Sequence, residues 1–392
     1  MARLINNRVY LDYNATSPFA PSVLDWLAKG DLLFANPSSV HSSGKKSARG
    51  MNEVKSYLYK LFGLKEDDFE IFFHSGATEG ANTILKGRAN FISRGIAQSF
   101  MPFYYFESDH SCIHKCADDL KTMHMPIFPL EVNSDGSFNL DDVISTIKEK
   151  SEHSLLNFTW VNNETGVVFP LEMAKKIKKE TGCRVHVDAV QSVSKIEDWT
   201  KLDPSLDAYT FSAHKFGALK GVGFTFYKRD FEFCSLIRGG GQQEGMRSGT
   251  ENILGIQSIP LALKEIVEKF NVKEMQKAKD WFEKNLNELL GDNGEVVAVK
   301  NKNRNLQTTY FITPKVKAHT LSMALDMSGV DVSNGSACSS GAVIPSRVLM
   351  AMGYSEELAM SAIRLSFSHH FDREEAQFAF EKIKPVLSRY FN

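Results

Sequence analysis

The sequence has few cysteines and no long hydrophobic run. Five cysteines in 392 residues is an odd and sparse number, which argues against a disulfide framework and leaves room for a reactive thiol. No stretch approaches the roughly 20 apolar residues of a membrane-spanning helix, and residues 1–8 lack the apolar core of a signal peptide. We therefore expect a cytoplasmic protein with no membrane partner.

The sequence also lacks an excess of charge of either sign. Its 46 basic and 47 acidic residues give a formal net charge of −1, so no overall field attracts nucleic acid or an anionic membrane. The glycine-rich segment 239–252 matches neither the dinucleotide-binding Gly-x-Gly-x-x-Gly pattern nor the phosphate-binding loop of nucleoside triphosphatases. The composition therefore favours a small-molecule partner that is neither a dinucleotide nor a nucleoside triphosphate.

What the sequence does contain is an alternation of strand and helix patterns. With 43% hydrophobic residues, the chain can bury a large core, and its length favours two domains. Short apolar runs predict strands at 70–74, 103–106, 155–161, 184–188, 208–211 and 221–227, with helical segments between them. This order predicts an α/β fold with a large, mostly parallel sheet that helices cover on both faces.

The C-terminal part has the pattern of a smaller α+β domain. Residues 253–290 are largely helical in pattern, and we expect a kink at Pro260. Strands are predicted at 308–312 and 363–367, with a helix near 321–327.

Two polar side chains follow buried strands. Lys215 comes after the strand 208–211, and ligands of open α/β sheets gather outside the carboxyl ends of strands. A lysine desolvated there can lose its proton near neutral pH and form a Schiff base with an aldehyde; the alternative is a lysine that simply emerges into solvent. Asp188 ends another strand, where a buried carboxylate needs a positive partner such as a protonated ring nitrogen.

The segment 75–80 is typical of an anion-binding site. It lies between a predicted strand and a predicted helix, so unpaired main-chain N–H groups and the positive end of the helix dipole point toward a ligand. Thr78 can add a hydroxyl group to such a site. The alternative is a plain helix cap made by Ser75 or Thr78.

Histidine and cysteine side chains mark two further places. His110, Cys112, His114 and Cys116 alternate, but on a helix they separate into two pairs on different sides, so we expect no metal site. His110 alone stays a candidate functional residue. Cys338 lies among small and polar neighbours, unlike a buried structural cysteine, and is the candidate reactive thiol.

Short motifs along nearly the whole chain resemble those of one enzyme family, in the same order. They are Tyr10–Thr16, Asn36–His41, Ser75–Glu79, Asn162–Gly166, Val187–Gln191, Ser212–Lys215, Arg247–Asn252 and Gly335–Ser340. The family is the cysteine desulfurases of the NifS/IscS type, which are class V, fold-type I transferases that use pyridoxal 5′-phosphate. The resemblance implies a large cofactor-binding domain at 16–260 and a small domain formed by 1–15 and 261–392.

The resemblance also assigns a cofactor site. It implies that Lys215 carries pyridoxal phosphate, that Asp188 pairs with the pyridinium nitrogen and that Gln191 bonds to the phenolic oxygen. The other implied cofactor contacts are Asn163, the ring-stacking His110, the phosphate-binding Ala77, Thr78, Ser212 and His214, and Thr250 from the other subunit of a homodimer.

The implied reaction converts L-cysteine to L-alanine. Asn14, Asn163 and Arg364 would hold the substrate, and Lys215, His110 and Cys338 would be the catalytic residues. The Cys338 thiolate would take the substrate sulfur as a persulfide. The sulfur would then pass to an acceptor protein, such as an iron–sulfur scaffold or a sulfur carrier, which the sequence does not identify.

The chain departs from the family pattern at Ala218–Leu219, at Asn334 and at His369–His370. These departures bear on the acceptor partner and on the active-site loop, not on the cofactor. A selenocysteine lyase, or another class V lyase or transaminase in which the thiol assists or is idle, is an alternative function. A third hypothesis is a homologue that has lost catalysis and acts as a binding partner or regulator. The presence of Lys215 and Cys338 argues against this third hypothesis, because a site that no longer catalyses a reaction does not require a reactive amine and a thiol.

Overall fold

The large sheet has seven strands. The computed structural model describes the chain apart from residues 1–3, 6–7, 96–99, 150–152, 335–343 and 392. Across the sheet the strands are β3 (Phe69–His74), β9 (Gly223–Lys228), β8 (Ala208–Ser212), β7 (Arg184–Asp188), β6 (Leu155–Thr159), β4 (Phe103–Phe106) and β5 (Ile127–Leu130). Neighbouring strands are parallel except β9, which is antiparallel to both β3 and β8. The prediction of a mostly parallel sheet is confirmed.

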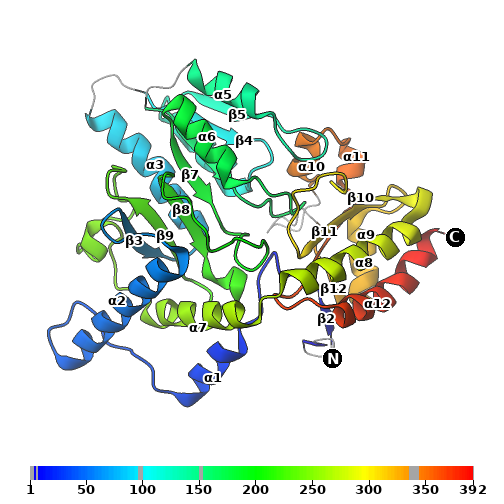
Figure 1. Ribbon diagram of the computed structural model, residues 1–392, viewed down its shortest axis with the longest axis horizontal. Helices are drawn as coiled ribbons and strands as arrows, with labels where there is room; N and C mark the ends of the chain where they lie inside the picture. Colours follow the sequence, from blue (N-terminus) through cyan, green and yellow to red (C-terminus); the bar gives the residue numbers. More distant parts are fainter. Residues whose placement is uncertain (1–3, 6–7, 96–99, 150–152, 335–343, 392) are drawn as a thin grey trace.

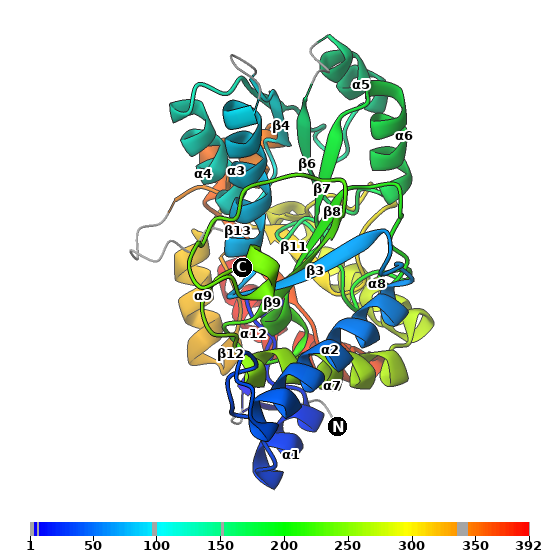
Figure 2. The ribbon, with the colours of Figure 1, turned by 90° about the vertical axis from the view of Figure 1, so that its left-hand side faces the viewer.

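Helices cover this sheet on both faces (Figures 1 and 2). On one face, Ile84 and Ile113 pack against strand residues such as Phe103. On the other, Val54 and Leu263 belong to the main core. The helices of the first face are α3 (Ala77–Gly95) and α4 (Ser111–Thr122), and those of the second are α2 (Ser42–Phe62), α5 (Leu140–Lys148), α6 (Leu171–Thr181) and α7 (Ile253–Lys269). Every residue of β8 is buried, and three of its five side chains are apolar or aromatic for this reason.

The remaining fold contains two three-stranded sheets and the helices that pack against them. One contains β10 (Glu295–Val296), β11 (Thr308–Ile312) and β13 (Ala362–Ser366), and the other contains β1 (Leu4–Ile5), β2 (Arg8–Tyr10) and β12 (Val330–Asp331). They share a core with the helices α8 (Val272–Leu290), α9 (Ala318–Met327) and α12 (Arg373–Phe391). The chain also contains three short helices, α1 (Pro21–Lys29), α10 (Arg347–Ala351) and α11 (Glu356–Ala359). The strands and the helix predicted here are present.

The helical stretch 253–290 is divided into α7 and α8. α7 continues through Pro260 and ends at Lys269, and the division lies at Phe270 and Asn271. Asn271 ends the run because its side chain accepts a hydrogen bond from the Glu274 N–H and so caps α8. The predicted domain boundary between residues 260 and 261 lies within α7, and the division into two domains stays a prediction. In the described part of the chain, no helix combines the length and apolar character that crossing a membrane requires.

The carboxyl ends of β6, β7 and β8 lie side by side. Thr159 pairs with Asp188, and Asp188 pairs with Thr210, in register. The segment after β2 reaches this edge, because the main-chain oxygen of Asn14 accepts hydrogen bonds from Lys215, which follows β8, and from Gln191, which follows β7. Residues of the small sheets therefore face the strand ends at which ligands bind in open α/β folds.

Candidate active site

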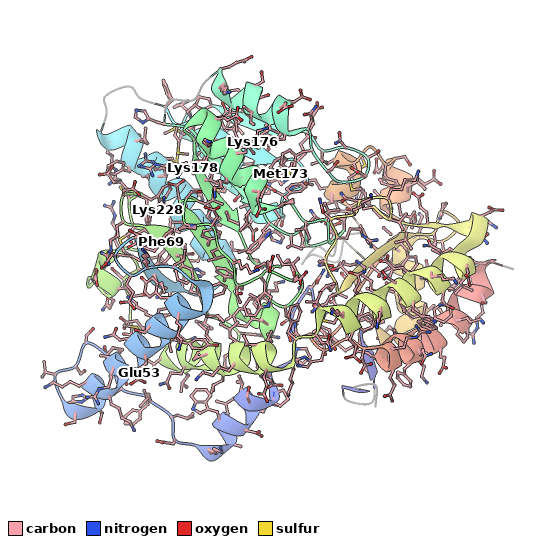
Figure 3. The ribbon with its side chains drawn as sticks, in the orientation of Figure 1. Glu53, Phe69, Met173, Lys176, Lys178 and Lys228 are labelled. Carbon is pink, nitrogen blue, oxygen red and sulfur yellow. The ribbon has the colours of Figure 1, made fainter. Side chains whose placement is uncertain are left out.

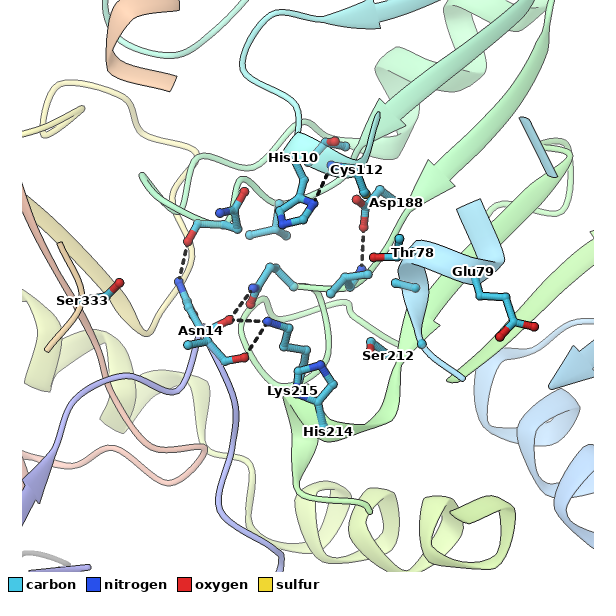
Figure 4. A pocket seen from close by; sticks show the side chains of 18 of the residues that line it. Asn14, Thr78, Glu79, His110, Cys112, Asp188, Ser212, His214, Lys215 and Ser333 are labelled. Atoms are coloured by element: carbon cyan, nitrogen blue, oxygen red, sulfur yellow. Dashed lines mark hydrogen bonds between the residues drawn. The ribbon is translucent and has the colours of Figure 1, made fainter. Parts of the chain in front are cut away.

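A cavity of about 590 Å³ opens at this edge of the large sheet (Figure 4). Predicted site residues that line it are Asn14, Ala77, Thr78, His110, Asn163, Asp188, Gln191, Ser212, His214, Lys215 and Arg364. The structure thus brings together side chains that are separated by up to 350 residues in the chain, from Asn14 to Arg364. Two predicted residues are not among them. Thr250 is exposed outside the cavity, and Cys338 lies outside the described residues.

Lys215 lies on a short 3₁₀ turn, Ala213–Phe216, directly after β8. Its Nζ donates hydrogen bonds to the main-chain oxygens of Asn14, at 2.7 Å, and Ala15, at 2.8 Å. Burial, together with the nearby positive charge of Arg364, lowers the pKa of Lys215 from 10.5 to about 8. A larger share of this amine is therefore neutral near pH 7 than for an ordinary lysine, as a reaction with a carbonyl group requires.

Asp188 is a half-buried carboxylate that lines the cavity and has no ion pair among the described residues. Its Oδ1 accepts a hydrogen bond from the Val190 N–H at 3.0 Å. Burial raises its pKa to about 6, although the Val190 N–H and Lys215 oppose the shift. The contrast is Asp207, which is fully buried and pairs with Arg184 of β7 and with Lys178. Lys178 lies on α6 (Figure 3). The Asp188 carboxylate therefore has no cationic partner, and a protonated ring nitrogen in the cavity would pair with it.

His110 is the N-cap residue of α4 and faces the cavity (Figure 4). Its Nδ1 accepts a hydrogen bond from the Cys112 N–H at 3.2 Å. Burial, with Lys215 and Arg364 nearby, lowers the pKa of His110 to about 4, so the imidazole is neutral. A neutral ring is suited to stacking on a flat ligand. The described residues hold no group of three or more His, Cys, Asp or Glu side chains placed for a metal.

The start of α3 forms one end of the cavity and is the candidate anion-binding turn. The helix begins at Ala77, and the side chains of Thr78, Ser212 and His214 lie around its first turn (Figure 4). Main-chain N–H groups at a helix start favour negative charge. Burial lowers the pKa of His214 to about 4, and its Nδ1 lies 3.1 Å from Thr16 Oγ1.

The glycine-rich loop is tied to this helix start by an ion pair. Arg247 Nε donates to Glu79 Oε1 at 2.8 Å, and Glu79 Oε2 accepts a hydrogen bond from the Ser75 N–H at 2.9 Å. The pair therefore fixes the loop that carries Thr250 relative to the anion-binding turn. Neither Arg247 nor Glu79 was predicted as a site residue.

Arg364 provides the positive charge of the cavity on the side of the small sheets. It lies on β13 and is 5% exposed. One terminal nitrogen donates to Asp12 Oδ1 at 2.8 Å and the other to the main-chain oxygen of Asn163 at 3.0 Å. A guanidinium group held in this way is preorganised to bind a carboxylate.

Sequence reasoning missed a buried polar chain beneath the site. Asn157 Nδ2 donates to Asp109 Oδ2 at 2.8 Å, and Asn157 Oδ1 lies 2.7 Å from His186 Nδ1. His186 Nε2 lies 2.8 Å from Thr210 Oγ1. The sequence showed polar residues such as Asn157 and His186 within strands that were expected to be buried. Polar side chains are buried only when they have hydrogen-bond partners, so these residues indicated such a network. His369, at one of the departures from the family pattern, is also buried outside the cavity and lies 3.1 Å from Ser17 Oγ.

Comparison with known proteins agrees with the fold. Residues 9–378 match the aminotransferase class-V family model. The chain is 30% identical to the cysteine desulfurase IscS of Dictyoglomus turgidum, over 98% of this chain and 96% of that protein. It is 32% identical to a cysteine desulfurase of Cereibacter sphaeroides, over 97% and 96% of the two chains.

Solved structures show the same relationship. A NifS-like protein superposes with a TM-score of 0.86 at 30% identity, over 97% of this chain and 100% of that one. A cysteine desulfurase of Thermococcus onnurineus superposes with a TM-score of 0.83 over 99% of this chain and 100% of that one, but at 19% identity it shows the fold alone. The fold is that of the fold-type I enzymes. The chain belongs to the aminotransferase class-V family, in the group whose curated members are named cysteine desulfurases.

Proposed function

We propose that this protein is a cysteine desulfurase, which converts L-cysteine to L-alanine and transfers the sulfur to its own Cys338. The observation that carries the proposal is the placement of Lys215, Asp188 and Arg364 around one cavity. They supply an amine of lowered pKa, a half-buried carboxylate without a cation and a guanidinium group held by hydrogen bonds to Asp12 and Asn163. The relatives at 30% identity or more over nearly the whole chain support the same activity.

The cavity fits pyridoxal 5′-phosphate. Asp188 suits a protonated pyridine nitrogen, the neutral His110 suits the ring face, and the α3 start suits the phosphate. The residues that would hold the cofactor are Lys215, Asp188, Gln191, His110, Asn163, Ala77, Thr78, Ser212, His214 and Thr250 of the partner subunit. When bound, this cofactor supplies an electron sink for the bond between Cα and its hydrogen in an amino acid substrate.

The protein's own residues bind the substrate and move protons. Arg364 binds the substrate carboxylate, and Asn163 and Asn14 line the same part of the cavity. Lys215 Nζ, with a pKa near 8, accepts and returns a proton close to neutral pH. Cys338 Sγ bonds to the substrate sulfur while the bond between that sulfur and Cβ breaks. Overall, one thiol and one cysteine give one persulfide and one alanine, so the reaction needs no external oxidant or reductant.

We further propose that the protein is a cytoplasmic homodimer of two-domain subunits that passes sulfur to an acceptor protein. Thr250 is exposed at the end of the loop that Arg247 ties to the anion-binding turn, a position from which it can complete the cavity of a second copy. An iron–sulfur scaffold or a sulfur carrier is the expected acceptor, since relatives of this chain are named IscS.

A single-turnover experiment tests the activity. Protein loaded with pyridoxal phosphate is mixed with less than one equivalent of L-cysteine, without a reductant, and alanine and protein-bound sulfane sulfur are measured. The proposal predicts equal amounts of both. Alanine with free sulfide and no protein-bound sulfur would mean a lyase, and formation of a keto acid would mean a transaminase. A parallel reaction with L-selenocysteine compares the two substrates.

A further inference from the structure

Lys195 is a buried lysine next to the cavity that the mechanism above does not use. Its side chain is 1% exposed. Its Nζ donates to Asn14 Oδ1 at 2.8 Å and to Gln191 Oε1, and it has no ion pair with a carboxylate among the described residues. Burial, with Lys215 and Arg364 nearby, lowers its pKa well below the usual value. Burying an amine without a counter-charge is costly, so its place requires an explanation.

The hydrogen-bonding chemistry of its two partners, the side-chain amides of Asn14 and Gln191, explains why Lys195 lies there. An amide side chain has an oxygen that only accepts and a nitrogen that only donates. An ammonium group offers only donors, and a neutral amine still has two N–H bonds, one for each oxygen. In either charge state Lys195 therefore holds the oxygens of Asn14 and Gln191 toward itself. The nitrogens of both amides must point the other way.

The observed contacts of the amide nitrogens agree with this orientation. Asn14 Nδ2 donates to Thr308 Oγ1 at 2.9 Å and to the main-chain oxygen of Asn163 at 3.1 Å. Gln191 Nε2 donates to the main-chain oxygen of Asn14 at 2.9 Å. This uses one of its two N–H bonds. Because Gln191 lines the cavity, the second N–H is a donor that a ligand oxygen can use.

We propose that Lys195 is a positioning residue that fixes the amide orientation of Gln191, so that the cavity presents a donor there and not an acceptor. This deepens the proposed function, on which it rests, because the donor would meet the phenolic oxygen of pyridoxal phosphate. The same lysine steadies Asn14, whose main-chain oxygen accepts from Lys215. Lys195 touches neither substrate nor cofactor in this account and acts through its two amide partners.

Replacement of Lys195 by methionine removes the donor at nearly constant volume. The Gln191 oxygen then loses its partner, and the amide is free to turn its oxygen toward the cavity. A donor stabilises a negatively charged phenolic oxygen, so its loss makes that oxygen more basic. We expect the pH midpoint of the bound cofactor's visible absorption to rise by about one unit, the size of one hydrogen bond to a charged group.

The experiment compares Lys195→Met with Lys279→Met. Lys279 is a second buried lysine, 3% exposed, which donates to the main-chain oxygen of Asn305 and has no bond to Gln191 or Asn14. Both variants should lower the thermal unfolding temperature, but only Lys195→Met should move the absorption midpoint. Gln191→Leu should move the midpoint as well, and adding Lys195→Met to Gln191→Leu should move it no further, since the lysine acts through the glutamine.

The outcomes separate the two proposals. A wild type that takes up no pyridoxal phosphate contradicts the proposed function. Two results would overturn the role of Lys195 alone, provided that the wild type takes up pyridoxal phosphate. One is an absorption midpoint of Lys195→Met equal to that of Lys279→Met. The other is that the effects of Lys195→Met and Gln191→Leu on the midpoint are additive. If Lys195→Met does not fold, Lys195→Gln keeps a shorter donor and should shift the midpoint upward by less than Gln191→Leu does. No shift in Lys195→Gln would then overturn the role.

Discussion

The ε-amino group of Lys215 donates a hydrogen bond to the main-chain oxygen of Asn14 at 2.7 Å. Lys215 follows β8 of the large sheet, whereas Asn14 follows β2 of a small sheet. The contact therefore joins the two parts of the fold at the reactive amine. Since Asn14 also accepts from Gln191 and contacts Lys195, the amine is placed by a network and not by its own turn alone.

Lys215→Ala should lose the visible absorption that pyridoxal phosphate gives when it is bound to the wild type. The amine is the group that would bond to the cofactor, and alanine has none. Absorption spectra after incubation with the cofactor and desalting measure the effect. The control is Lys220→Ala, a neighbouring exposed lysine, which should keep the wild-type spectrum. Equal absorption of the Lys215→Ala and wild-type proteins would contradict the assignment.

The rate at which the apoprotein takes up pyridoxal phosphate should rise with pH through a midpoint near 8 and level off above it. Only the neutral amine reacts, and the pKa of Lys215 is lowered from 10.5 to about 8. Because Arg364 contributes to the lowering, Arg364→Met should move the midpoint to higher pH, and Arg364→Lys, which keeps the charge, should move it less. Stopped-flow absorbance across pH 6 to 10.5 measures both. A wild-type midpoint near 10.5 would contradict the burial of a reactive amine.

Arg364→Lys should raise the KM for L-cysteine by about 10-fold to 100-fold, since a lysine cannot reproduce the paired hydrogen bonds of a guanidinium group. Steady-state alanine formation measures KM and kcat separately. Arg184→Lys serves as the control, because Arg184 pairs with Asp207 and Asp230, away from the cavity. An unchanged KM in Arg364→Lys would rule out its contact with the substrate carboxylate.

Thr250→Val should release cofactor more readily and weaken the dimer. If Thr250 completes the phosphate site of a second copy, cofactor binding and dimerisation stabilise each other by mass action. Light scattering and cofactor absorbance after dilution measure the two effects, and Thr122→Val, at an exposed helix position, is the control. A wild-type monomer that keeps its cofactor would refute the link.

The sequence was sufficient to predict the large sheet and most of the cavity, because apolar strands and the short motifs at their ends are local signals. β5 was not predicted. It is the edge strand and contains Pro129, which lacks the N–H that an inner strand needs, so the pattern was unlike that of the other strands. Lys195 was missed because one partner, Asn14, lies 181 residues away. Pro260 lies inside α7, which runs on to Lys269, and the kink expected there stays a prediction.

Cys338→Ser tests the central claim most directly. The variant loaded with cofactor is mixed with L-cysteine, and the spectrum, protein-bound sulfur and alanine are measured together, with Cys234→Ser, a half-buried cysteine outside the cavity, as the control. Serine keeps the size and polarity of the side chain but not a nucleophile that ionises near neutral pH. We predict that Cys338→Ser still changes its spectrum on mixing but forms no persulfide and almost no alanine, while Cys234→Ser behaves as the wild type. Alanine formation by Cys338→Ser at close to the wild-type rate would contradict the account.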